Sequence, residues 1–179
     1  GLTVGIVGFG RIGQRLAELL GPFRCPLLVV DPYVPDPFLV AYGAKRVSIA
    51  EAAREADALV VCAASNSGTR QLLDREILFS LKPNAVLVNV ARAALADTAA
   101  LIERLERGDL IAALDVFDQE PLPKDHPLRE LPNAFLTPHR GGGINASVVR
   151  ILDLLISDLE GFFQGRPFSS PLTHSMINS

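Results

Sequence analysis

Short apolar runs alternate with segments of helical periodicity along almost the whole chain. The strand-like runs are residues 2–10, 25–31, 57–63, 85–91, 110–117 and 133–139. The segments with helical spacing are residues 11–21, 48–56, 74–81, 96–109 and a longer one at 145–165. Ser48 and Asp97 occupy the positions expected of helix N-caps. This alternation predicts parallel strands joined by helical crossovers, and therefore a doubly wound α/β sheet.

Length and composition agree with that architecture. The 179 residues fit one domain, expected over residues 1–168, followed by a loose polar tail at 169–179. Hydrophobic residues make up 49% of the chain and aromatic residues only 6%. A core of small aliphatic side chains suits a parallel sheet that is buried under helices on both faces.

Charge and cysteine content narrow the classes of partner and compartment. With 17 basic and 20 acidic residues, the net charge is −3. Nucleic acids and anionic membrane surfaces require a basic excess or patch, so neither is an expected partner. Cys25 and Cys62 are too few for a disulfide framework and lack metal-ligand spacing, so we expect no metal. Reduced cysteines and an N-terminus without a signal-peptide layout favour a cytoplasmic location.

The first turn of the predicted sheet reads G-F-G-R-I-G, residues 8–13. Alone this pattern also fits an ordinary glycine turn, but here it leaves a strand and opens a helix. Gly8 then permits the tight turn, Gly10 lets a pyrophosphate approach the backbone, and Gly13 lets the helix pack closely on the sheet. Arg11 and Ile12 begin the helix whose N–H groups would bind the phosphates.

Asp31 ends the second strand, 18 residues after Gly13. A carboxylate at this place can accept both hydroxyls of an adenosine ribose and would repel a 2′-phosphate, so NAD is favoured over NADP. The alternative is an aspartate that merely caps a turn. The glycines upstream favour the ribose role.

Three further polar side chains follow apolar runs near the expected cofactor end of the sheet: Arg92, Glu120 and His139. A guanidinium can hold a carboxylate in a fork, and a histidine can exchange a proton with a carbonyl oxygen as a hydride reaches the carbon. A buried glutamate beside the histidine would orient it. Taken singly, each residue also fits a position without a catalytic role: Arg92 as a surface arginine, Glu120 as a solvated glutamate, and His139 as a loop histidine that caps the last helix. His126, expected to be exposed, and His174, in the tail, receive no role.

Five stretches carry a resemblance to a known family: TVGIVGFGRIGQRLA, VVDPY, LKPNAVLVNVARAAL, AALDVFDQEPLP and LPNAFLTPHRGG. Over residues 3–142 the chain resembles the nucleotide-binding domain of the D-isomer-specific 2-hydroxyacid dehydrogenases. The resemblance implies a Rossmann-like fold, NAD as cofactor, a small 2-hydroxy or 2-keto acid as substrate, and a homodimer.

The resemblance also implies roles for single residues. Arg92 matches the arginine that binds the substrate carboxylate and carbonyl, and His139 matches the catalytic histidine with which Glu120 is paired. The implied cofactor contacts are Cys62, Ala63 and Ala64 on the adenosine side, Val90 and Ala91 beneath the nicotinamide ribose, Asp115 near the carboxamide, and Gly141 in the glycine run that leaves room for the nicotinamide.

The chain departs from the family in three places. Ala93 and Ala94 stand where two glycines are common, so the local turn is expected to differ. The segment CAASNSGTR is reminiscent of the C-terminal-binding-protein corepressors. Because the chain starts at the first predicted strand, we expect a fragment without the family's smaller substrate domain, which binds NAD(H) but turns over ketoacids poorly. Two other hypotheses stay open: a non-enzymatic NAD(H)-sensing module, and a Rossmann domain for another ligand such as S-adenosylmethionine.

Overall fold

The computed structural model of the chain describes residues 1–143, 145–169 and 171. It divides into two compact units, Gly1–Pro138 and His139–Ser179. Most of the predicted tail, residues 170 and 172–179, lies outside the described residues, and His174 lies there too.

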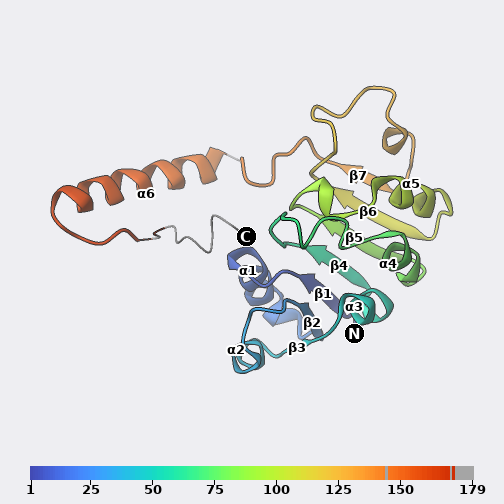
Figure 1. Cartoon of the computed structure of the whole chain (residues 1–179), viewed down its shortest axis with the longest axis horizontal. Coiled ribbons are helices and arrows are strands. Elements are labelled where there is room, and N and C mark those ends of the chain that lie inside the picture. The colour runs from blue at the N-terminus through green and yellow to red at the C-terminus, as the bar shows by residue number, and fades with distance from the viewer. Residues whose placement is uncertain (144, 170, 172–179) are drawn as a thin grey trace. The chain divides into compact units, whose positions relative to one another are not determined.

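The first unit is built on one seven-stranded sheet with the order β3-β2-β1-β4-β5-β6-β7 (Figure 1). Every neighbouring pair is parallel. The strands are β1 Val4–Val7, β2 Leu27–Val30, β3 Ala44–Arg46, β4 Ala58–Val61, β5 Ala85–Asn89, β6 Leu110–Leu114 and β7 Ala134–Leu136. The strand order reverses between β1 and β4, which is the point where such sheets bind ligands.

Helical crossovers connect the strands, and the predicted doubly wound α/β fold is confirmed. The helices of the first unit are α1 Arg11–Leu20, α2 Asp36–Ala41, α3 Ile49–Glu55, α4 Arg75–Ser80 and α5 Thr98–Glu106, with 3₁₀ turns η1 Gly21–Phe23, η2 Ala93–Leu95 and η3 Pro127–Arg129. The sequence pattern did not predict α2 or β3. Both are short, and Pro35 and Pro37 interrupt the apolar periodicity there.

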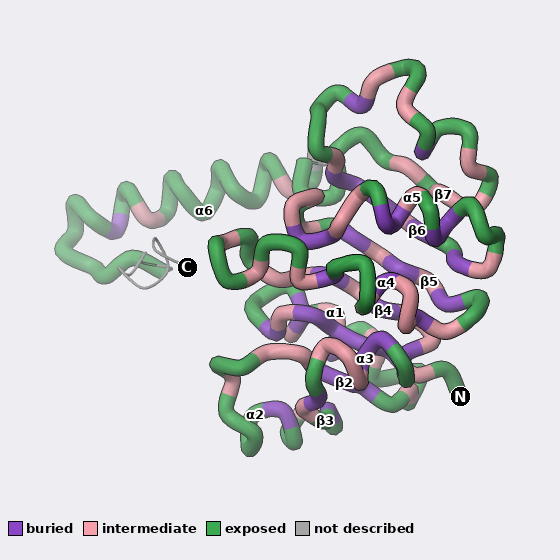
Figure 2. The backbone as a smooth tube through the Cα atoms, turned by 45° about the vertical axis from the view of Figure 1, so that its right-hand side comes forward, coloured by how far each residue is buried: buried purple, intermediate pink, exposed green. Residues whose placement is uncertain are grey.

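Two apolar layers sandwich the sheet. Leu78, Leu101 and Leu105 come from α4 and α5 and join one core cluster. Ala17 and Leu39 come from α1 and α2 and join the other. Figure 2 shows that the backbone of the central strands is largely buried. Within the first unit the second face is less covered than the composition suggested, since Ile111 on β6 is 36% exposed and Phe135 on β7 is 64% exposed. The β6 and β7 end of the sheet is therefore buried mainly on its α4–α5 side.

Both predicted N-caps are present. The Asp97 carboxylate accepts the Ala100 N–H at 3.0 Å. The Ser48 hydroxyl accepts the Glu51 N–H, and the Glu51 carboxylate accepts the Ser48 N–H at 2.8 Å, which completes a capping box. The carboxylate's hydrogen bonds to Ser48 hold the pKa of Glu51 below its ordinary value.

We expect Ser48→Ala to lower the free energy of unfolding by about 1 kcal/mol, because the first turn of α3 loses a side-chain acceptor. Urea denaturation followed by circular dichroism measures the change. Ser67→Ala is the control, since Ser67 is exposed and lies outside the helices. Equal midpoints for both variants would contradict a stabilising capping box.

The second unit contains α6, Asn145–Phe163. Most of its described apolar side chains are exposed, including Ile151, Leu155 and Phe163. Even so, within the described ranges no helix has both the length and the apolar composition to cross a membrane.

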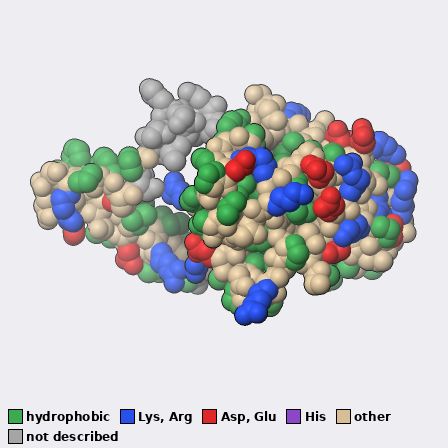
Figure 3. Space-filling model, turned by 90° about the horizontal axis from the view of Figure 1, so that it is seen from below, with side chains coloured by type: hydrophobic (Ala, Val, Ile, Leu, Met, Phe, Trp, Pro, Cys, Tyr) green, Lys and Arg blue, Asp and Glu red, His purple; other side chains and the backbone are tan. Residues whose placement is uncertain are grey.

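Basic and acidic side chains are interspersed on the face of the molecule shown in Figure 3, and neither sign of charge forms a separate patch there.

Candidate dinucleotide site

A single register row crosses the first unit at the carboxyl ends of its strands. Val7 pairs with Val30 and Val61, Val61 with Asn89, Asn89 with Leu114, and Leu114 with Leu136. The residues that follow this row in the chain are Asp31, Gly8, Cys62, Val90, Asp115 and Thr137. The sheet thus brings most of the predicted cofactor residues to one edge, where doubly wound sheets bind their ligands.

The glycine turn packs against the segment that follows β4. Gly8 has a φ of 88°, and a Cβ added there would lie 2.5 Å from the Ala63 Cα. A Cβ on Gly13 would lie 2.3 Å from the Gly8 carbonyl oxygen. The first position therefore requires glycine for both its backbone conformation and its close approach, and the second for helix packing, as predicted.

Gly10 is different, because a Cβ added there would meet no protein atom within 4 Å. It is exposed and forms the N-cap of α1 with extended backbone. The helix's first backbone bond joins the Gln14 N–H to the Gly10 carbonyl oxygen, so the N–H groups of Arg11, Ile12 and Gly13 precede the helical ladder. Open space beside these donors, at the positive end of the helix dipole, fits an approaching pyrophosphate.

The Asp31 carboxylate links the glycine turn to the loop after β2. Its Oδ2 accepts the Phe9 N–H at 2.7 Å, and its Oδ1 accepts the N–H groups of Tyr33 and Val34 at 2.9 and 3.3 Å. The turn-capping role that sequence left open is therefore real. A carboxylate has about four acceptor positions, so capping does not exhaust its capacity for a ribose hydroxyl.

The segment after β4 runs along the same edge. The Cys62 N–H donates to the Val7 carbonyl oxygen at 2.8 Å, which continues the β1–β4 ladder. Cys62 is half-buried, and burial raises the pKa of its thiol to about 11, so it is protonated at neutral pH. The unusual sequence beyond Ala64 forms a turn in which the Asn66 side chain accepts the N–H groups of Gly68 and Thr69.

Arg92 lies on a turn that a buried asparagine holds. Asn89 is only 4% exposed, and its side chain donates to the Arg92 carbonyl oxygen at 3.0 Å and accepts the Ala91 N–H at 3.1 Å. Arg92 itself is exposed, as is Val90. Ala93 and Ala94 enter a 3₁₀ turn without positive φ, so they fit where glycines were expected. The sequence pattern did not single out Asn89, although a side-chain amide inside the apolar run AVLVNVA indicates a buried polar group that needs hydrogen-bond partners.

The two acidic residues beyond β6 differ in environment. Asp115 is 5% exposed and accepts a hydrogen bond from the Thr137 hydroxyl. The sequence left open whether Glu120 is buried beside the histidine or solvated. Glu120 is exposed, and its Oε1 accepts the Phe117 N–H at 3.0 Å, so its side chain bonds back to its own surface loop.

The structure places His139 and Gly141 in the second unit, whereas Arg92, Asp115 and Glu120 lie in the first. His139 is exposed and has a φ of 50°, which is unusual for a residue other than glycine. His126, expected to be exposed, is half-buried because its Nδ1 caps η3 by accepting the Leu128 N–H at 3.3 Å. It therefore has a structural role.

A doubly wound parallel sheet with a glycine turn, an open helix N-terminus and an acidic residue after β2 defines a dinucleotide-binding domain. More specifically, the chain belongs to the D-isomer specific 2-hydroxyacid dehydrogenase family and is its NAD binding domain, since that family's model matches residues 1–141.

Individual proteins agree with this assignment. The chain is 40% identical over 143 residues to D-3-phosphoglycerate dehydrogenase of Methanocaldococcus jannaschii, covering 79% of this chain and 27% of that protein. It is 35% identical over 167 residues to glyoxylate reductase of Aeropyrum pernix, covering 93% and 50%. The crystal structure of the TT0316 protein from Thermus thermophilus superimposes with a TM-score of 0.83 and 40% identity, covering 97% of this chain and 54% of that one. The chain thus spans half or less of the two curated relatives.

Proposed function

We propose that this chain is the cofactor half of an NAD-dependent dehydrogenase that interconverts a small 2-hydroxy acid and its 2-keto acid. The observation that carries the proposal is the carboxyl edge of the sheet, where the glycine turn, Asp31 and the Arg92 turn lie along one register row. Membership of the family and the names of relatives, such as glyoxylate reductase, support the reaction class.

In this proposal NAD(H) supplies or accepts the hydride at the substrate carbon that carries the hydroxyl or carbonyl group. Arg92 binds the substrate carboxylate in a fork and polarises the adjacent carbonyl oxygen. His139 donates a proton to that oxygen during reduction and removes it during oxidation. Glu120 orients the His139 ring. Support for these roles comes from the match of the stretches around all three residues to the family pattern.

The remaining cofactor residues would bind NAD(H) through backbone N–H groups and through van der Waals contacts. The N–H groups at the start of α1 bind the phosphates, while Cys62, Ala63 and Ala64 border the adenosine half. Val90, Ala91, Asp115 and Gly141 would surround the nicotinamide half, as their sequence match suggests. The proposal further includes a homodimer and a cytoplasmic location. Sedimentation velocity of the purified chain would test the dimer.

The test of the cofactor site is calorimetric titration with NADH and with NADPH. We expect NADH to bind more tightly, because the Asp31 carboxylate accepts a ribose hydroxyl and repels a 2′-phosphate. Asp31→Ala should weaken NADH binding roughly tenfold, the effect of losing a hydrogen bond to a charged group, and should narrow the preference over NADPH.

Asp74→Ala is the matched control. Asp74 also accepts a backbone N–H, that of Ile77 at 2.9 Å, but it caps α4. The control variant should bind NADH as the wild type does. Wild-type protein that binds neither dinucleotide would overturn the proposed function for this chain.

A further inference from the structure

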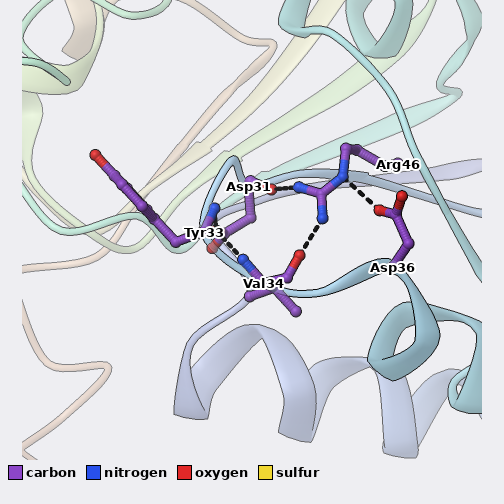
Figure 4. Close-up of polar contacts among 5 residues, drawn as sticks. All are labelled: Asp31, Tyr33, Val34, Asp36 and Arg46. Carbon is purple, nitrogen blue, oxygen red and sulfur yellow. Dashed lines mark hydrogen bonds and ion pairs between the residues drawn. The ribbon is translucent and has the colours of Figure 1, made fainter.

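The loop that follows β2 is held from a second side by Arg46, the last residue of β3 (Figure 4). Its Nη1 donates to the Asp31 carbonyl oxygen and its Nη2 to the Val34 carbonyl oxygen. Its Nε pairs with the Asp36 carboxylate at 2.7 Å. All three guanidinium nitrogens therefore have acceptors in the segment from Asp31 to Asp36.

These contacts complement those of the Asp31 side chain. The carboxylate accepts N–H groups from Phe9, Tyr33 and Val34, which draws the loop toward the glycine turn. Arg46 binds carbonyl oxygens of the same loop. The backbone of residues 31–34 is thus fixed through both its N–H and its C=O groups, and the orientation of the Asp31 carboxylate is fixed with it.

The Arg46 guanidinium suits this task because it is a planar fork with donors at fixed angles. Its side chain is only 32% exposed, whereas that of Asp36 is 75% exposed. A solvent-exposed ion pair contributes little stability by itself. The contacts with two backbone carbonyls are therefore the part of the arrangement that determines loop geometry, and Asp36 helps to orient the fork.

We propose that Arg46 is a positioning residue for the dinucleotide: it holds the Asp31 loop so that the Asp31 carboxylate meets the adenosine ribose. This inference rests on the proposed function, since it requires NAD(H) to bind at the glycine turn and Asp31. In this proposal Arg46 acts through Asp31, because all three of its guanidinium nitrogens already have acceptors in the segment from Asp31 to Asp36.

The test is a double-mutant cycle in which NADH binding to the 179-residue chain is measured by calorimetry. Arg46→Met keeps the aliphatic stem and removes every donor. In the wild-type background it should weaken NADH binding about tenfold, because small misplacements of a positioning group are costly. In the Asp31→Ala background it should change binding less than about twofold, since the group that Arg46 positions is gone. Arg46→Met should weaken the binding of NADPH less than that of NADH, because the Asp31 carboxylate does not stabilise bound NADPH.

Arg75→Met is the control, because Arg75 makes a two-bond pair with Glu103 at 2.6 and 2.7 Å on the α4–α5 side of the sheet. It should leave NADH affinity unchanged in both backgrounds. If Arg46→Met does not fold by circular dichroism, Asp36→Ala provides the same cycle, with an expected loss of about threefold in the wild-type background and none beside Asp31→Ala.

The two hypotheses fail differently. Wild-type protein that does not bind NADH overturns the proposed function, and this inference with it. Wild-type binding that Arg46→Met leaves unchanged, or weakens equally with and without Asp31, overturns the positioning role alone.

Discussion

Gly10→Ala should weaken NADH binding by about 100-fold while the protein stays folded. An added Cβ at Gly10 meets no protein atom within 4 Å, so the chain itself tolerates the methyl group. The methyl group would instead occupy the space from which a pyrophosphate reaches the N–H groups of α1. Overpacking of this kind typically costs about 1–3 kcal/mol, and the upper part of that range corresponds to about 100-fold in affinity.

The matched control is Gly21→Ala at the other end of the same helix. Gly21 also has nothing within 4 Å of an added Cβ, and its φ of −48° suits alanine. Alanine is a poorer N-cap than glycine, so Gly10→Ala also lowers stability by about 1 kcal/mol or less. Calorimetric titration with NADH and thermal denaturation separate the two effects. Tight NADH binding by a folded Gly10→Ala protein would place the pyrophosphate elsewhere.

The sequence predicted the parts of this fold that depend on local pattern. Apolar runs identified the long strands, and serine and aspartate identified the starts of α3 and α5, because side-chain caps act within one helical turn. The glycine motif predicted which glycine faces protein and which faces open space, since each position in the turn has its own steric requirement. The location of the candidate site at the carboxyl ends of the strands followed from the predicted parallel topology.

Contacts between distant segments could not be predicted in the same way. In the sequence, Arg46 is only a polar residue shortly before the N-cap of a helix. The pairing of β3 with β2 is what brings it to the Asp31 loop. The exposure of Glu120 depends on the path of its surface loop, which no periodicity encodes. The functions of Arg92, Glu120 and His139 also remain predictions. They rest on family resemblance, and they require a substrate to be tested.

Asn89→Ala should lower the free energy of unfolding by about 2–3 kcal/mol and loosen the turn that carries Arg92. The substitution leaves the Ala91 N–H without its acceptor, which costs about 1–3 kcal/mol, and removes one hydrogen bond to the Arg92 carbonyl oxygen, which is worth about 1 kcal/mol. The Leu95 N–H also donates to the Arg92 carbonyl oxygen at 3.3 Å, so η2 should loosen together with the turn. Urea denaturation measures the stability.

Amide hydrogen exchange distinguishes a local effect on the Arg92 turn from a general loss of stability, and Asn133→Ala is the matched control. The Asn133 side chain likewise bridges backbone groups, donating to the carbonyl oxygens of Leu105 and Leu110 at 2.9 and 2.7 Å, but it lies at the amino ends of β6 and β7. Under native conditions Asn89→Ala should speed exchange in residues 90–96 about tenfold more than Asn133→Ala does, because local opening adds to global unfolding there. Equal acceleration in the two variants would mean that Asn89 stabilises the core as a whole and does not hold Arg92. A selective increase would show that the Asn89 amide fixes the turn that carries Arg92.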